Sequence, residues 1–309
     1  SADIYIKKKK ENKFWGYFVK VQIVLTIIFL FLSFFYGIIL GLQEESEDQT
    51  SSTQTYTPPV ERKEKNILQQ IFTSNQSAIK IGTLLDKTGD LGSYGPPMEV
   101  GADLAIKLLQ DAGVDIVKVP GDSGTANQKS IAEATRLIDI EGVDAIVGSL
   151  SSGVTMATAI AVTIPKNIPI MSPASTSPAI TVMEDNDTVF RSTVSDAAQG
   201  VVLAQFAWDQ GIRSAGAIYI NNPYGEGLAN MFGDKFRELG GKITALVPSE
   251  PGQTSYLSEV KKATAGNPDV LLAMTYPVTA QIYIREAIEG GHANKFMFVD
   301  GTKAQDMFD

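Results

Sequence analysis

Cysteine is absent from this chain of 309 residues, and histidine occurs once, at His292. Without cysteine the chain forms no disulfide, offers no thiol nucleophile, holds no metal through thiolates and carries no lipid anchor on a modified cysteine. A single histidine excludes both a Ser/His/Asp triad and a metal site built from several histidines. Because His292 lies between a predicted helix and a predicted strand, we expect it to be a solvated loop residue.

Sequence patterns that mark nucleotide-binding and hydrolytic enzymes are absent as well. Neither GxxxxGK[ST] nor GxGxxG occurs, and GSLSSG at residues 148–153 does not have the spacing of a GxSxG nucleophile elbow. Asp86 and Asp90 fall in one predicted loop, where a solvated pair of carboxylates is favoured over an acid–base couple. The sequence therefore predicts a protein that is not an enzyme and needs no cofactor or metal.

Basic residues are outnumbered by acidic ones, 26 to 35, which gives a formal net charge of −9. Residues 1–20 hold six lysines and only two acids, so the rest of the chain carries 20 basic and 33 acidic residues. Nucleic-acid affinity comes from Lys and Arg side chains that neutralise phosphates. We therefore expect no nucleic-acid partner.

Residues 21–42, VQIVLTIIFLFLSFFYGIILGL, contain no charged side chain. At about 1.5 Å of rise per residue, a helix of this length crosses the roughly 30 Å hydrocarbon layer of a bilayer. Lysines precede this segment and acids follow it, so the positive-inside rule predicts a cytoplasmic N-terminus over residues 1–20, a transmembrane helix over 21–42 and a periplasmic remainder. This is the topology of a single-pass protein of the inner membrane.

A cleaved signal peptide is the alternative interpretation of residues 21–42. The apolar region of a signal peptide usually spans about 7–15 residues and ends in a small-x-small cleavage site. The segment is longer than that, and GIILGLQEE lacks such a site. An uncleaved anchor is therefore the favoured interpretation.

Residues 43–77 are rich in Ser, Thr, Gln and charge, with Pro58 and Pro59 near their middle. Such a composition buries too little apolar surface to offset chain entropy, which predicts a flexible linker. From residue 78 onward, short apolar runs alternate with amphipathic helical stretches, which is typical of βαβ units on parallel sheets. We predict an α/β fold of two doubly wound lobes, over residues 78–195 and 196–309.

The expected strands are short apolar runs in both lobes. They cover residues 78–85, 115–119, 144–148, 168–173, 215–220, 243–248, 269–274 and 295–300. The first helix is expected to bury one stripe of apolar residues at helical spacing: Met98, Ala102, Ala105, Ile106 and Leu109. A last helix is expected to begin at Ala304.

In open parallel sheets a ligand lies beyond the carboxyl ends of the strands, so the loops that follow the strands are the place to look for function. Here these loops read GDLGSYG, GSLSSG, SPASTSP, NNPYGEG, TYPVTA and VDGTKAQ. They combine small hydroxyl residues, backbone amides, tyrosines and one acid. The sequence predicts a ligand site formed by these loops.

From about residue 78 to 308 the chain resembles the branched-chain amino acid-binding proteins, which are the Leu/Ile/Val-binding members of the type I periplasmic binding protein family. The resemblance rests on a tyrosine in the first loop, GxLSS before a helix, SPASTSP, YGEG and FMxxDG, in the family's order. It implies the two-lobed Venus-flytrap fold. It also implies an extracytoplasmic solute-binding protein for an amino acid or related small molecule, which feeds an ABC-type permease.

The resemblance implies roles for individual residues in binding the two charges of an amino acid. Ser152 and Thr176 would hold the α-carboxylate through hydroxyls and amides, aided by Ser151 and Ala174, and Asp300 would accept the α-ammonium. Because Ser152 precedes a predicted helix, the helix amides and dipole would favour an anion there.

The resemblance also implies the walls of the pocket. Tyr224 and Tyr276 would close over the ligand from the second lobe, and Tyr94 would wall the side-chain pocket. Leu150 and Ser175 are expected to line it.

Structural alternatives stay open for several of these residues. Tyr224 would pack at a helix start, and Asp300 would cap a short helix near Thr302. Ser152 and Thr176 would be helix or turn caps, a role that is compatible with anion binding.

Two features depart from the family's pattern. Family members usually move freely in the periplasm or are held by a lipid, whereas this chain has its own predicted membrane helix. The family's domain also continues beyond the point where this chain ends, so we expect that the return of the chain to the first lobe is missing. The alternative function is an accessory or sensory subunit that keeps the binding-protein fold for docking in a membrane complex.

Overall fold

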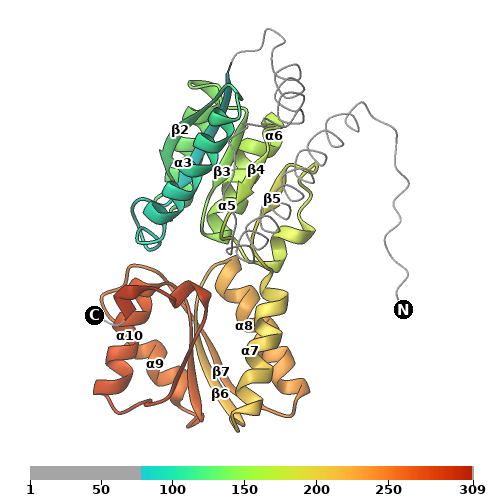
Figure 1. Cartoon of the computed structure of the whole chain (residues 1–309). Coiled ribbons are helices and arrows are strands. Elements are labelled where there is room, and N and C mark those ends of the chain that lie inside the picture. Colours follow the sequence, from blue (N-terminus) through green and yellow to red (C-terminus); the bar gives the residue numbers. More distant parts are fainter. Residues whose placement is uncertain (1–77, 308–309) are drawn as a thin grey trace, which may run out of the picture. The chain divides into compact units, whose positions relative to one another are not determined.

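The computed structural model describes residues 78–307. The predicted cytoplasmic segment, transmembrane helix and linker, residues 1–77, lie outside these described residues, as do residues 308–309. Within residues 78–307, each helix is too short or too polar to cross a membrane. The strands form two parallel sheets covered by helices, which confirms the prediction of an α/β fold (Figure 1).

The first sheet has the strand order β2-β1-β3-β4-β5, and every neighbouring pair is parallel. Its strands are β1 (Ile79–Leu85), β2 (Ile116–Asp122), β3 (Ala145–Gly148), β4 (Ile170–Ser172) and β5 (Val189–Arg191). Its helices are α3 (Gly95–Asp111), α4 (Asn127–Asp139), α5 (Ser152–Thr158), the π-helical η1 (Ala159–Thr163), α6 (Ile164–Lys166) and the 3-10 helix η2 (Pro178–Val182).

The second sheet has the order β7-β6-β8-β9 and is also parallel throughout. Its strands are β6 (Ser214–Ile220), β7 (Lys242–Ser249), β8 (Val270–Met274) and β9 (Phe296–Phe298). Its helices are α7 (Asp196–Asp209), α8 (Pro223–Glu238), α9 (Leu257–Thr264) and α10 (Pro277–Glu289), followed by the 3-10 turns η3 (Asp300–Thr302) and η4 (Gln305–Met307).

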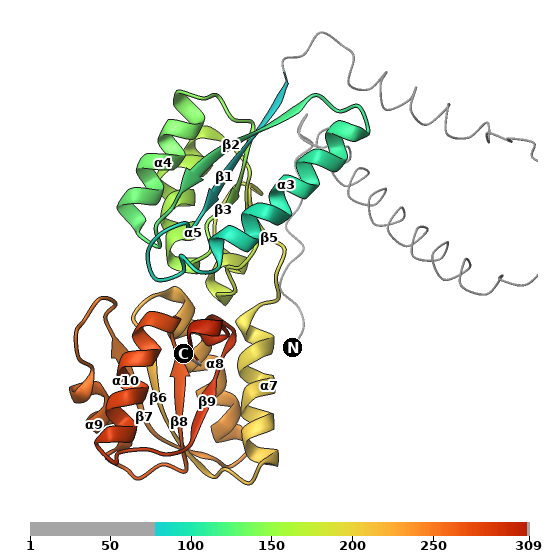
Figure 2. The same ribbon diagram turned by 60° about the vertical axis from the view of Figure 1, so that its left-hand side comes forward.

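In both sheets the strand order reverses next to the first strand, as can be followed in Figure 2. β1 lies between β2 and β3, and β6 lies between β7 and β8. The loops that follow β1 and β3, and those that follow β6 and β8, therefore run to opposite faces, and at such a reversal open α/β sheets commonly bind their ligands.

Strand β8 is buried along its whole length because helices cover both faces of its sheet. Leu272 and Met274 belong to the core beneath α7 and α8, whereas Leu271 and Ala273 belong to the core beneath α9 and α10. A strand covered on both faces is expected to be a continuous apolar run, as VLLAM is.

All of the predicted strands are present, and the differences from prediction concern short or edge elements. β5, a three-residue strand at the edge of the first sheet, is not among the predicted strands. The predicted helix at Ala304 is the 3-10 turn η4.

The prediction of a buried stripe on α3 is wrong in part. Met98, Ala102, Ile106 and Leu109 are half-buried, and Ala105 is exposed. Helical spacing tells which residues share a face, but only the tertiary structure decides how completely that face is covered. Among the described residues, α3 packs on β1 and β2, and this contact leaves the stripe half covered.

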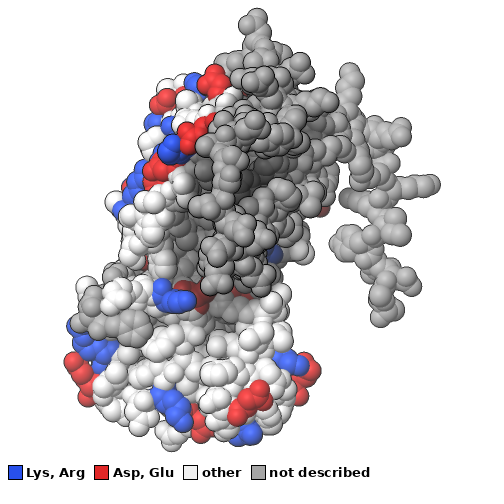
Figure 3. All heavy atoms as spheres, in the orientation of Figure 1, with Lys and Arg blue, Asp and Glu red and all other residues white. Residues whose placement is uncertain are grey.

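Acidic and basic side chains of the described residues are interspersed on the face shown in Figure 3. Several of them form ion pairs. Lys118, for example, pairs with Glu99 and Asp103, and Arg136 pairs with Glu133 and Glu141. This mixture differs from the concentrated positive charge by which proteins bind nucleic acids.

Candidate ligand-binding site

The chain leaves β3 through Gly148, whose φ is +142°. A Cβ at this position would lie 2.2 Å from the carbonyl oxygen of Leu84, so this turn requires glycine. It delivers Leu150, Ser151 and Ser152, all of them buried, to the carboxyl edge of the first sheet. The structure thus places these three predicted residues together at the start of α5.

Asp86 anchors this loop from the end of β1. Its carboxylate accepts hydrogen bonds from the hydroxyls of Ser123 and Thr125 and, at 3.2 Å, from the backbone N–H of Leu150. Burial raises the pKa of Asp86, and these donors oppose the increase. The interpretation of Asp86 and Asp90 as a solvated pair is therefore wrong for Asp86, which is fully buried. Its carboxylate instead ties together the ends of three strands.

The loop after β4 carries Ala174 and Ser175. The backbone N–H groups of both donate to Ser172 Oγ, at 3.3 and 2.9 Å. The Ser175 hydroxyl lies 2.9 Å from Thr155 Oγ1 and donates to the carbonyl of Leu150 at 3.1 Å. Ser175 thus links the loop after β4 to the loop after β3. Its predicted role in lining the ligand pocket stays a prediction.

Ser152 and Thr176 form further links from these loops. The Ser152 hydroxyl accepts a 3.1 Å hydrogen bond from the N–H of Ser177. The Thr176 hydroxyl lies 2.8 Å from a carboxylate oxygen of Asp196, to which it donates. Neither hydroxyl caps its own helix or turn, because each forms its hydrogen bond with another segment of the chain.

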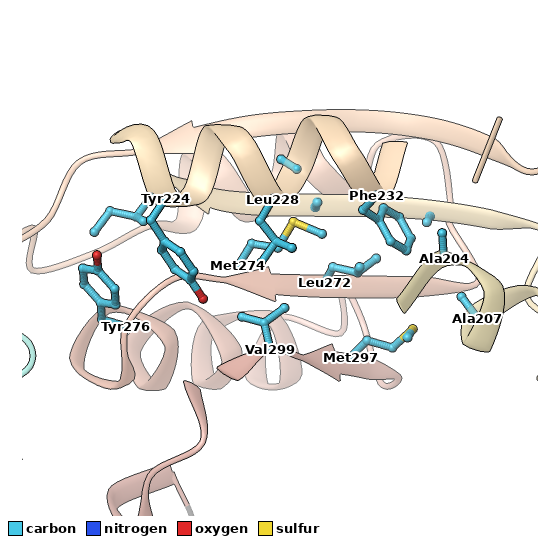
Figure 4. Packing of buried hydrophobic residues seen from close by; sticks show 14 of the residues in the cluster. Ala204, Ala207, Tyr224, Leu228, Phe232, Leu272, Met274, Tyr276, Met297 and Val299 are labelled. Carbon is cyan, nitrogen blue, oxygen red and sulfur yellow. The ribbon is translucent and has the colours of Figure 1, made fainter. Parts of the chain in front are cut away.

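The second sheet contributes Tyr224, Tyr276 and Asp300. Asn222 caps α8 by accepting from the N–H groups of Tyr224 and Gly225, each at 3.0 Å. The rings of Tyr224 and Tyr276 stack with centroids 5.5 Å apart and 9° between their planes, at one end of the apolar core (Figure 4). The stack fixes both hydroxyl positions.

The Tyr224 hydroxyl donates to a carboxylate oxygen of Asp300 at 2.7 Å and accepts from the N–H of Gly301 at 3.1 Å. Burial raises the pKa of Tyr224 well above its usual range, and the negative charge of Asp300 adds to the increase. Tyr224 therefore stays a proton donor toward Asp300. The alternative for Asp300 is wrong, because Val299 and not Asp300 is the N-cap of η3. The alternative for Tyr224 is confirmed, because Tyr224 lies in the first turn of α8 and packs in the core.

Within residues 78–307, several hydrogen bonds connect loops of the first lobe to residues of the second. The Tyr276 hydroxyl donates to Ser151 Oγ at 3.0 Å. The Tyr94 hydroxyl donates to the carbonyl of Gly301 at 3.2 Å, and the Ser177 hydroxyl donates to the carbonyl of Pro223 at 2.8 Å. Predicted site residues from both lobes therefore meet directly.

The sequence-based prediction missed two residues of this arrangement, Asp196 and Gln199 on α7. The amide of Gln199 donates to Asp196 at 3.2 Å, and its oxygen accepts from the N–H of Asp300 at 3.3 Å. Burial raises the pKa of Asp196 to about 7, the hydrogen bond from Thr176 opposes this, and the charge of Asp300 adds to it. An acid and a glutamine three residues apart share a helix face, and this spacing in SDAAQ was the available signal.

A pocket of about 380 Å³ opens beside Asp300. It is lined by Gln199, Phe298, Val299, Asp300, Thr302, Lys303 and Met307. Asp300 is the one predicted site residue that lines it, and the residues of the hydroxyl-rich first-lobe loops are not among its lining. Within residues 78–307, Asp, Glu and His side chains do not gather in a group of three or more that would hold a metal ion.

A family model described as periplasmic binding protein matches residues 78–307. The chain belongs to the periplasmic binding protein family. A Leu/Ile/Val-binding protein homolog of Brucella abortus is 28% identical over 235 residues, an alignment that covers 74% of this chain and 62% of the relative. The chain thus spans less than two thirds of the length of this curated relative.

Solved structures of two binding proteins are similar to this fold. A leucine-binding protein from Thermotoga maritima is 26% identical, with a TM-score of 0.68 over 75% of this chain and 66% of that one. A branched-chain amino acid-binding protein from Streptococcus pneumoniae, solved in complex with isoleucine, is 24% identical with a TM-score of 0.65 and covers the same shares. The second likeness shows the fold alone. These relatives are named as binding proteins and not as enzymes.

Proposed function

We propose that this protein is the solute-binding component of an ABC-type transporter, for an amino acid such as leucine or a related small molecule. The observation that carries the proposal is the hydrogen bond from Tyr224 to Asp300, beside the stacked ring of Tyr276, whose hydroxyl donates to the buried Ser151 of the first lobe. The similarity to Leu/Ile/Val-binding relatives supports the same ligand class.

This site suits a zwitterion because the two lobes offer chemically different groups. The first-lobe loops offer hydroxyls and backbone amides, which are donors for a carboxylate. Asp300 is exposed and offers a carboxylate to an ammonium group, a charge-assisted hydrogen bond of about 1.5–3 kcal/mol. A compound without either charge would leave the matching protein groups without a partner.

Transport then follows from lobe closure. In this proposal the lobes are residues 78–195 and 196–309, and a ligand held by one recruits the other by a hinge motion. The closed form presents one surface to a permease. The charge-free segment of residues 21–42 would hold the protein at the periplasmic face of the inner membrane.

The direct contacts between lobes also favour a second candidate function. Hydrogen bonds such as Tyr276 to Ser151 and Ser177 to Pro223 hold the lobes by protein groups alone. A docking or sensory subunit of a membrane complex would need only a fixed arrangement of the two lobes, without a ligand. Purification from the native membrane distinguishes the two, since a stable complex without a permease would favour the docking subunit.

The ligand is tested by calorimetry on the full chain in detergent, with L-leucine, L-isoleucine and L-valine as probes. We expect at least one of them to bind and to raise the melting temperature, because a ligand that binds the native state stabilises it. Asp300→Asn should weaken that binding by about 2–5 kcal/mol, since it removes the charge that meets the ammonium.

Asp234→Asn is the matched control, because Asp234 is a solvent-exposed acid that pairs with Arg237 on α8. It should bind the amino acid like the unchanged protein. A folded protein that binds none of the three probes would exclude this ligand class and leave the docking function as the better account.

A further inference from the structure

Asp196 has an unusual position for an ionisable group. It is the first residue of α7, and its side chain is fully buried. Its carboxyl oxygens accept from two uncharged groups, the hydroxyl of Thr176 at 2.8 Å and the amide of Gln199 at 3.2 Å. The orientation of that amide is fixed, because the oxygen of Gln199 must accept the N–H of Asp300.

The charged and titratable groups around Asp196 come from three other elements. Asp300 after β9 adds negative charge, and Arg191 at the end of β5 is the nearby cation. The Tyr224 hydroxyl on α8 is neutral and donates to Asp300. The guanidinium of Arg191 donates to the carbonyls of Thr176 and Ser177, at 3.2 and 2.7 Å, and to the hydroxyl of Thr181. Burial next to a second acid therefore favours the neutral form of Asp196, and the pKa of about 7 agrees with this geometry.

The protonation of Asp196 determines what the Thr176 hydroxyl can offer. This hydroxyl has one proton. If Asp196 is ionised, Thr176 donates its proton to Asp196 and can present only lone pairs elsewhere. If Asp196 is protonated, its own O–H donates to Thr176 Oγ1, and the Thr176 proton is free to point to a ligand.

We propose that Asp196 is a positioning residue that, when protonated, turns the Thr176 hydroxyl into a donor for the carboxylate of the ligand. The proposal rests on the proposed function, because it takes Thr176 as a carboxylate contact. Gln199 serves it by holding the other oxygen of Asp196 as an acceptor, so that the proton resides on the oxygen that faces Thr176.

The expected pH dependence follows from linkage. A ligand carboxylate beside Thr176 brings further negative charge, so the bound state keeps the proton on Asp196. Above the pKa of the free protein, about 7, binding must take up one proton, and affinity should fall by up to about tenfold per pH unit. Below that pKa the proton is already in place and the affinity should be level.

The test measures L-leucine binding by calorimetry on the full chain at several values between about pH 6 and about pH 8.5, in two buffers that differ in ionisation enthalpy. The unchanged protein should take up a proton when it binds leucine near the upper end of this pH range. In Asp196→Asn the amide NH₂ imitates the protonated acid, so this variant should bind leucine at high pH at least as tightly as the unchanged protein, without pH dependence.

Asp209→Asn at the other end of α7 is the control, because Asp209 is an exposed acid that accepts from Gln205. It should keep the pH dependence. Proton release on leucine binding, or a level affinity in the unchanged protein across this range, would overturn the inference while leaving the proposed function standing.

A second measurement does not need a ligand. Since the folded-state pKa of Asp196 is raised, its stabilising contribution is present below about pH 4 and is lost as pH rises to about 7. The difference in melting temperature between Asp196→Asn and the unchanged protein should therefore grow in favour of the variant over this window. A difference that is constant with pH would show that Asp196 ionises normally and would refute the inference even if leucine does not bind.

Discussion

Gly301 lies at the point where three parts of the site meet. Its carbonyl accepts from the Tyr94 hydroxyl, and its N–H donates to the Tyr224 hydroxyl. A Cβ at this position would lie 2.5 Å from the Tyr224 hydroxyl oxygen and 2.8 Å from the carbonyl of Thr275. The absence of a side chain is therefore what lets Tyr224 reach Asp300.

We predict that Gly301→Ala displaces Tyr224 from Asp300. The variant should lose about 1–3 kcal/mol of unfolding free energy through overpacking, and leucine binding should weaken with it. Denaturant unfolding and calorimetry measure the two effects. Gly101→Ala on α3 is the control, since its Cβ meets nothing within 4 Å. It should gain about 1 kcal/mol through helix propensity. Unchanged stability and binding in Gly301→Ala would contradict this account of Tyr224.

At the scale of elements, α8 joins the site to the core. Its first turn holds Tyr224 beneath the Asn222 cap, and its later turns bury Leu228, Phe232 and Phe236. Phe232 and Phe236 stack with ring centroids 5.3 Å apart. The position of the Tyr224 hydroxyl thus depends on apolar packing further along the same helix.

We predict that Phe232→Ala costs about 3–5 kcal/mol of unfolding free energy, the usual effect of removing a fully buried aromatic ring. Phe206→Ala on α7 is the matched control, because 55% of that residue's surface is exposed. The control should cost less than about 1 kcal/mol. Denaturant unfolding of both variants checks this, and equal losses would show that the core beneath α8 is misassigned.

At the scale of the whole molecule, the loops at the carboxyl edges of the two parallel sheets hydrogen-bond to each other. α7 connects them through Asp196, whose N–H donates to the carbonyl of Thr176 at 2.8 Å. The segment that joins the lobes is therefore itself hydrogen-bonded to a predicted ligand loop. A hinge motion between the lobes would therefore change the geometry of this hydrogen bond.

We predict that the full chain stays in the membrane pellet after an alkaline carbonate wash of cells that express it. A variant that lacks residues 21–42 should be released, since the charge-free segment is the predicted anchor. Immunoblots of pellet and supernatant measure the distribution. Release of the full chain by the wash would refute the anchor and favour the interpretation of residues 21–42 as a signal peptide.

The order of strands and helices could be predicted from the sequence because local residue patterns specify it. VLLAM is a run of apolar residues bounded by polar ones, and it is β8. The glycine- and serine-rich loops could be placed at strand ends for the same reason, and with them Ser151, Tyr224, Tyr276 and Asp300. Whether these residues contact a ligand stays a prediction.

Only the tertiary structure decided which polar groups are buried and whom they contact. Asp86 and Asp196 resemble ordinary loop and helix-start acids in sequence, yet both are fully buried and join distant segments. Likewise, the spacing on α3 identified one face of a helix but not how far it is covered. The sequence by itself determined the elements and the chemistry of their ends, because these depend on neighbours along the chain. Burial and partner choice depend on neighbours in space, so the fold decided them.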